Sequence, residues 1–152
     1  MLEDPYHPPR RRHHADDLGA NGPIGEELAR DLRRHYTHEI RLVGRRPEKV
    51  HDDDELVVAD LTDPEATDRA VAGSEIAYLT VGLPMDSELW ERQFPVMVRN
   101  VIDACERHDT KLVFFDNTYM YPGTTAPQTE ETRFEPNGRK GRVRAQLATM
   151  LL

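Results

Sequence analysis

The chain has 152 residues, enough for one domain of ordinary size and about half of what a two-domain enzyme usually needs. Hydrophobic residues make up 38% and charged residues 32%, and the formal net charge of −8 argues against non-specific binding to nucleic acid or to an anionic membrane. No apolar run approaches the ~18 residues of a membrane span, and the first twenty residues do not resemble a signal peptide. The single Cys105 excludes a disulfide within the chain, so the sequence predicts a cytoplasmic protein.

The first 18 residues differ in composition from the rest. They combine three prolines, a basic run at residues 10–12 and paired His and Asp residues, and they show no hydrophobic period. We therefore expect residues 1–18 to form a disordered or loosely docked tail and residues 19–152 to form one folded domain. The chain offers no spaced pairs of ligands typical of a metal centre, so we predict no metal site.

After residue 18, short apolar runs alternate with amphipathic stretches. Pro23 suits a first helical turn, and the apolar positions that follow it at helical spacing predict a helix ending near His35. The same criteria predict, in chain order, strands at 39–43 and 56–59, a helix from 63 to 73, a strand at 76–81, a long helix at 87–107 that Pro95 should kink or restart, a strand at 112–115 and a final helix at 139–152. Apolar strands separated by helices are typical of a doubly wound α/β fold with a parallel sheet covered on both faces.

The most informative motif is a glycine-rich loop that opens the first predicted helix, Gly19-Ala20-Asn21-Gly22-Pro23-Ile24-Gly25. Glycines at this spacing allow a tight turn, let backbone N–H groups approach a pyrophosphate and let the helix pack closely on the sheet. At the end of the next strand, dinucleotide sites carry either an acid for the ribose hydroxyls or an arginine for a 2′-phosphate. Arg45 and Arg46 stand at this point, so the sequence favours NADP over NAD.

Together these segments resemble the NAD-dependent epimerase/dehydratase family, the extended or atypical branch of the short-chain dehydrogenases. The motifs that carry the resemblance are, in order, the glycine loop, Arg41-Leu42-Val43-Gly44-Arg45-Arg46, Ala59-Asp60-Leu61-Thr62-Asp63, Thr80-Val81-Gly82, and Leu112-Val113-Phe114-Phe115-Asp116-Asn117 followed by Tyr119-Met120-Tyr121. The resemblance implies that the loop and the first helix hold the pyrophosphate, that Asp60 meets the adenine and that the segment after Val81 lies against the ribose. The predicted cofactor-binding residues are Gly19, Asn21, Gly22, Pro23, Ile24, Gly25, Arg45, Arg46, Asp60, Leu61, Val81 and Gly82.

The sequence departs from the family pattern just before the glycine loop. Family members have a buried apolar strand there, whereas residues 12–18 are Arg-His-His-Ala-Asp-Asp-Leu. Burial of these side chains between two layers would cost several kcal/mol per ion. We therefore expect the first strand to be missing or poorly formed, which would leave the loop anchored on one side only.

A second departure concerns the reaction. The hydride transfer of the family uses a Tyr-x-x-x-Lys pair and a Ser or Thr that binds the substrate oxygen. In this chain the Tyr position is Asn137, the Lys position is Gly141 and the Ser or Thr position is Asn117. None of the three matches, so the remaining candidates for catalytic residues are Asn117, Tyr121 and Lys140.

The third departure is that the chain ends at Leu152, inside what would be the active-site helix, so we expect the C-terminal substrate domain to be absent. The apolar face of that helix would then be exposed and would favour a homo-oligomer; it consists of Val143, Leu147, Met150, Leu151 and Leu152. Three interpretations stay open: an oxidoreductase-like or epimerase-like domain, a non-catalytic protein that binds or senses NADP, and a truncated interaction module without a cofactor. Substrate turnover would select the first interpretation, and cofactor binding without turnover the second. Self-association without cofactor binding would select the third.

Overall fold

The computed structural model describes residues 14–152, so the part of the expected tail up to His13 lies outside the described residues. Within this range each predicted element is present close to its expected bounds. The elements in chain order are β1 (Ala15–Leu18), α1 (Pro23–His35), β2 (Ile40–Gly44), β3 (Glu55–Val58), α2 (Pro64–Val71), β4 (Ile76–Leu79), α3 (Ser87–His108), β5 (Lys111–Phe114) and α4 (Gly138–Leu151).

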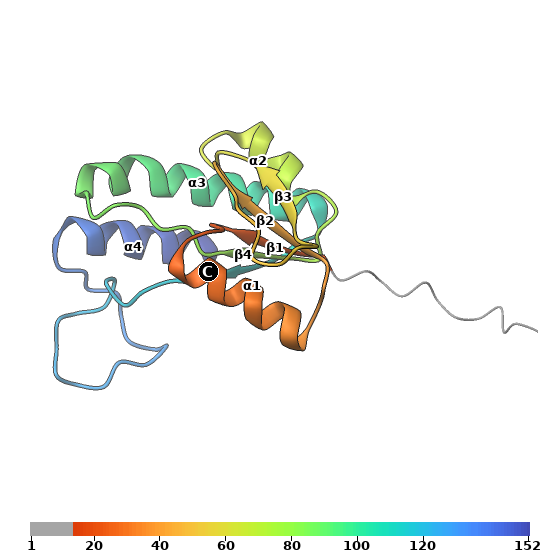
Figure 1. Ribbon diagram of the computed structural model, residues 1–152. Coiled ribbons are helices and arrows are strands. Elements are labelled where there is room, and N and C mark those ends of the chain that lie inside the picture. The colour runs from red at the N-terminus through yellow and green to blue at the C-terminus, as the bar shows by residue number, and fades with distance from the viewer. Residues whose placement is uncertain (1–13) are drawn as a thin grey trace, which may run out of the picture.

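The strands form one parallel sheet in the order β3-β2-β1-β4-β5. Helix α1 covers one face, and α2, α3 and α4 cover the other (Figure 1). The chain builds β2 and β3 on one side of β1 and then crosses to β4 and β5 on the other side, so the strand order reverses between β1 and β4. The predicted doubly wound α/β fold is confirmed, and folds of this kind bind ligands beyond the carboxyl ends of the strands at such a reversal.

Helix α3 continues through Pro95 as one helix, so the restart that the sequence allowed at this residue does not occur. A proline inside a helix removes one backbone hydrogen bond and crowds the preceding turn. Here the buried side chains of Trp90 and Phe94 before the proline and of Met97 and Val98 after it hold both halves against the core. Their burial outweighs the local cost of the proline.

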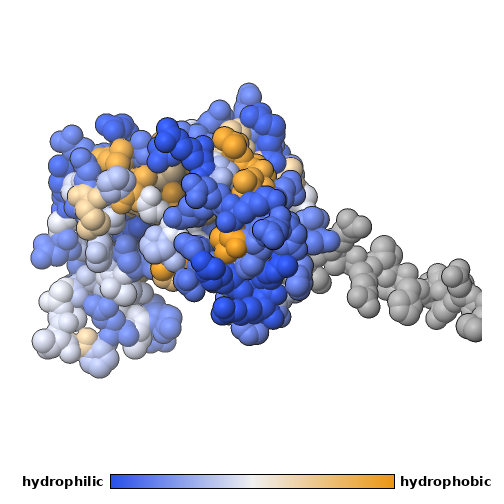
Figure 2. Space-filling view, viewed as in Figure 1, coloured by the Kyte–Doolittle hydropathy of each residue, from blue (hydrophilic) through white to orange (hydrophobic). Residues whose placement is uncertain are grey.

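The apolar face of α4 is covered, contrary to the expectation of an exposed face. Val143 and Leu147 are buried in the larger hydrophobic cluster, and Met150 and Leu151 pack against it, because α4 lies along α3. Leu152 alone in this set is fully exposed, at 98%. The argument for a homo-oligomer from this face therefore loses its basis. On the side shown in Figure 2, hydrophilic side chains dominate and hydrophobic ones form separate patches.

In the described part of the chain, no helix combines the length and the apolar character that crossing a membrane requires.

Strand β1 is present at the centre of the sheet, which overturns the expectation that it is missing and places Ala15–Leu18 inside the folded domain. Asp16 lies directly opposite Arg41 of β2. The guanidinium donates to both carboxylate oxygens, from Nε to Oδ1 at 2.5 Å and from Nη2 to Oδ2 at 2.8 Å. Arg41 also donates to the carbonyl oxygen of Ala72 at the end of α2 (3.0 Å), so the buried acid is paired within a hydrogen-bonded network rather than isolated.

Asp17 points to the opposite face, beneath α1, and is also fully buried. Its Oδ1 atom accepts a hydrogen bond from Thr80 Oγ1 at 2.7 Å, whereas its Oδ2 atom has no partner among the described residues. Burial raises the pKa of Asp17 from 3.8 to about 6. The ionised form of this side chain is therefore disfavoured in the folded protein.

The raised pKa predicts how stability depends on pH. Because folded Asp17 holds its proton up to about pH 6, whereas the unfolded chain loses it near 3.8, the free energy of unfolding falls as the pH rises through this window and is level above it. The cost at neutral pH is on the order of 3 kcal/mol. We expect Asp17→Asn to unfold at higher urea concentration than the wild type at pH 7.5, with the difference shrinking towards pH 4.5. A difference that stays constant over this range would contradict the assignment.

Candidate functional site

A cavity of about 830 Å³ opens at the carboxyl ends of β1, β2 and β4, where the strand order reverses. Its size lies within the usual range for ligand pockets. The loop after β1 forms one wall, the start of the segment after β2 another and the segment after β4 a third. The lining residues are Gly19, Ala20, Asn21, Gly22, Pro23, Ile24, Gly44, Arg45, Arg46, Thr80, Val81, Gly82 and Leu83.

The glycine loop brings the N-terminus of α1 to this cavity. A Cβ atom at Gly19, whose φ is +136°, would lie 2.5 Å from the backbone nitrogen of Val81, so only glycine lets the loop pass this close to the end of β4. Helix α1 has no side-chain cap because its N-cap residue is Gly22. The first N–H groups of a helix lack intrahelical partners and favour an anion, so this wall suits a phosphate group.

A smaller cavity of about 80 Å³ adjoins the first around the ends of β2 and β3. It contains Asp60, which accepts hydrogen bonds from the backbone N–H and the hydroxyl of Thr62, at 2.9 and 2.8 Å. These bonds, with a contribution from the positive charge of Arg45, hold the pKa of Asp60 below its usual value. The site therefore presents an ionised carboxylate on this side. The lining residues are Gly19, Val43, Gly44, Arg45, Ala59, Asp60, Leu61, Val81, Gly82, Leu83, Gln93 and Met97.

The structure brings the predicted cofactor residues together, with one exception. Gly25 lines neither cavity; it is buried beneath the loop, where a Cβ atom would lie 2.6 Å from Asp17 Oδ2. Sequence analysis missed several lining residues, and those from α3 are Gln93 and Met97. No local signal distinguishes these two from other positions of the helix, because their place in the site depends on how α3 crosses the sheet. Thr80 could have been predicted as a lining residue, because it directly precedes the predicted Val81 at the end of β4.

The candidates for catalytic residues lie apart from this lining. Asn117 follows β5, and its side chain accepts a hydrogen bond from the backbone N–H of Tyr119. The ring of Tyr121 packs edge-on against Phe134, and the ammonium group of Lys140 lies 5.9 Å from the centre of the Trp90 ring. The two cavities include none of the three among their lining residues.

A buried arginine holds the segment after β5 against α4. Arg144 is only 6% exposed, and its guanidinium lies over the rings of Trp90, Phe94 and Phe114 at 4.9, 4.4 and 5.8 Å. Its Nη1 atom donates to Asp116 Oδ1 at 3.2 Å. Burial lowers the pKa of Arg144 and raises that of Asp116. This pair, which sequence analysis did not single out, fixes where the chain leaves the sheet.

Among residues 14–152, no group of three or more His, Cys, Asp or Glu side chains is arranged to hold a metal ion. The acidic turn after His51 has a structural role instead. The buried carboxylate of Asp54 accepts hydrogen bonds from the backbone N–H groups of Val50 and His51, at 3.0 and 2.6 Å.

The fold is shared with several solved structures of dehydrogenases and epimerases. Uronate dehydrogenase from Agrobacterium tumefaciens superposes with a TM-score of 0.80 at 19% identity, over 92% of this chain and 55% of that one. Glucuronic acid dehydrogenase from Chromohalobacter salexigens superposes with a TM-score of 0.80 at 17% identity, over 91% of this chain and 54% of that one. A UDP-glucose 4-epimerase from Thermus thermophilus, in complex with NAD, superposes with a TM-score of 0.75 at 18% identity, over 91% of this chain and 49% of that one. The chain thus spans about half the length of these proteins.

A search of curated proteins finds no match to the sequence. The model of a protein family described as NAD(P)H-binding matches residues 19–134, which include both cavities and all the strands after β1. Because this match extends over well more than half of the sequence, the chain belongs to the NAD(P)H-binding family.

Proposed function

We propose that the chain binds the dinucleotide across the two cavities and prefers NADP(H) to NAD(H). The observation that carries this proposal is that Arg45 and Arg46 line the same cavity as the uncapped N-terminus of α1. A dinucleotide that carries a 2′-phosphate needs both features. The helix terminus suits the pyrophosphate, and the guanidinium groups suit the additional phosphate.

The chemistry at the end of β2 favours the phosphorylated cofactor. Both arginines are exposed and lie directly after Gly44, the last residue of the strand, where a carboxylate would bind the free ribose hydroxyls of NAD. The nearest acid in the site, Asp60, lies at the end of the next strand and faces the smaller cavity. In this proposal the adenosine lies between Asp60 and Arg45, with the 2′-phosphate against the arginines.

Removal of the guanidinium tests the preference. We expect Arg45→Ala to weaken NADPH binding by about tenfold, or roughly 1.4 kcal/mol, and NADH binding by less than about twofold. Isothermal titration with each nucleotide measures both values. Arg34→Ala serves as the matched control, because this exposed arginine of α1 has the same charge and lines neither cavity. An equal effect of Arg45→Ala on the two nucleotides would refute the proposed preference.

A second candidate function is a cofactor-binding protein without the Tyr–Lys reaction of the family it resembles. Position 141, where that resemblance places the lysine, is a buried glycine at the start of α4. A Cβ atom there would lie 2.6 Å from the carbonyl oxygen of Tyr119 and 3.0 Å from Pro136 Cβ. The loop backbone thus occupies the space through which a lysine side chain would leave the helix. This contact favours binding without that proton relay.

The close contact at Gly141 predicts the effect of a single methyl group. We expect Gly141→Ala to lower the free energy of unfolding by about 1–3 kcal/mol, because the added atom overlaps a loop that Arg144 pins to the same helix. Urea unfolding measures the change. Gly123→Ala is the matched control, since a Cβ atom there meets nothing within 4 Å. Equal stability of the two variants would show that position 141 has room for a side chain.

A further inference from the structure

The connection between β2 and β3 has no helix, although parallel neighbouring strands are usually joined through one. Residues 45–54 make this crossover as an irregular segment. Arg45 and Arg46 stand at its beginning. A segment without internal helical hydrogen bonds depends on side-chain contacts for its shape, so the contacts of this segment decide where the two guanidinium groups are held.

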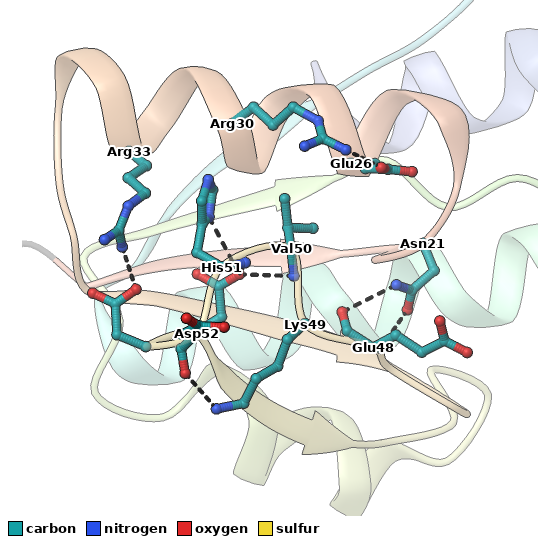
Figure 3. A network of polar contacts seen from close by, with 11 residues as sticks. Asn21, Glu26, Arg30, Arg33, Glu48, Lys49, Val50, His51 and Asp52 are labelled. Carbon is teal, nitrogen blue, oxygen red and sulfur yellow. Dashed lines mark hydrogen bonds and ion pairs between the residues drawn. The ribbon is translucent and has the colours of Figure 1, made fainter.

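The side chain of Asn21 connects the glycine loop to this segment (Figure 3). Its Nδ2 atom donates to the carbonyl oxygen of Glu48 at 3.1 Å, and its Oδ1 atom accepts from the backbone N–H of Glu48 at 2.8 Å. The amide thus pairs with both backbone groups of one residue, as a neighbouring strand would. Since Pro47 restricts the backbone of Arg46 to extended conformations, holding Glu48 also constrains the direction of Arg46.

The second half of the segment is held separately. Asp54 accepts the N–H groups of Val50 and His51, Arg33 of α1 pairs with Asp53, and Lys49 Nζ donates to the carbonyl oxygen of Asp52 at 2.6 Å. Figure 3 shows these contacts grouped at the end of the network away from Asn21. The backbone N–H groups of Gly19 and Ala20 donate to the carbonyl oxygen of Val43, each at 3.2 Å, and hold the end of β2. Beyond the strand end, the Asn21 amide makes the side-chain hydrogen bonds from the glycine loop to the arginine-bearing half.

The backbone of Asn21 makes a clean test of this side chain possible. Its φ is +71°, in the left-handed region that glycine adopts without strain and asparagine tolerates better than most residues. Asn21→Gly therefore removes the two hydrogen bonds to Glu48 while it keeps the backbone conformation of the loop. A loss of preference for NADPH in this variant therefore reports on the Asn21 side chain and not on backbone strain at this position.

We propose that Asn21 is a positioning residue for cofactor specificity: it fixes the segment that carries Arg45 and Arg46 at the distance from the phosphate loop that a 2′-phosphate requires. The inference rests on the proposed preference for NADP(H). Without the two hydrogen bonds from Asn21 to Glu48, both arginines are still present, but the segment that carries them is free to move. The phosphate must then restrain it on binding, and preorganisation of this kind is a large part of affinity.

The test measures the dissociation constants of NADPH and NADH for the full chain, the Asn21→Gly variant and Lys49→Met. The last is a control that removes the side-chain hydrogen bond from Lys49 to the carbonyl oxygen of Asp52 within the same segment. We expect Asn21→Gly to weaken NADPH binding about fivefold or more and NADH binding by less than about twofold, and Lys49→Met to leave the ratio of the two constants unchanged. Hydrogen exchange of the Glu48 amide, measured without nucleotide, should accelerate in Asn21→Gly and not in Lys49→Met.

The outcomes separate the two proposals. If Arg45→Ala abolishes the preference for NADPH and Asn21→Gly leaves it intact, the inference on Asn21 is overturned while the proposed function stands. An equal loss of both nucleotides in Asn21→Gly also overturns it, because the amide would then serve the loop that both cofactors use. If the wild type binds both nucleotides equally and Arg45→Ala changes nothing, the proposed preference fails and the inference fails with it.

Discussion

The pair of Asp16 and Arg41 is the interaction on which the rest of this molecule depends. β1 is the central strand, and the glycine loop begins where that strand ends, so a fold that could not bury Asp16 would have no defined phosphate loop. The two residues face each other across neighbouring strands, and the pairing is bidentate. A buried pair of this kind does not by itself add much stability, because both ions lose their hydration. It makes the strand possible at a tolerable cost, and loss of either partner would leave an uncompensated charge at the centre of the sheet.

The other face of β1 carries an uncompensated carboxyl group directly beneath the proposed binding site. Asp17 receives one hydrogen bond from Thr80, and Gly25 passes so close that no side chain fits between helix and carboxylate. Thr80 also lines the larger cavity. The same close packing that brings the N-terminus of α1 to the cavity therefore encloses Asp17, and the folded protein is more stable when this acid is protonated than when it is ionised. Binding geometry and the main internal electrostatic cost lie in one place, which is common for functional sites and rare in a core built for stability alone.

Much of the architecture could be predicted from local patterns, because apolar runs and helical spacing can be recognised within short segments of the sequence. The glycine loop and the arginines after β2 were found in the same way. β1 was missed because the partner that neutralises Asp16 lies 25 positions away, at Arg41. A signal was present: a single arginine inside the otherwise apolar run of β2 needs an acid within reach, and strand register puts Asp16 opposite it. The covered face of α4 was missed because it depends on contact with α3. Local sequence patterns do not show how these two helices pack against each other.

The crossover between β2 and β3 shows how the polar side chains of this chain replace regular structure. A helix there would satisfy its own backbone and would hold the following strand without help from the loop after β1. The irregular segment is instead held by hydrogen bonds from Asn21 at one end and to Asp54 at the other. The Asn21 amide thus adds a side-chain link between the phosphate loop and the arginine-bearing segment to the backbone hydrogen bonds that join Gly19 and Ala20 to Val43. Because this added link is one exposed amide and not part of a packed core, a single substitution can remove it without unfolding the domain.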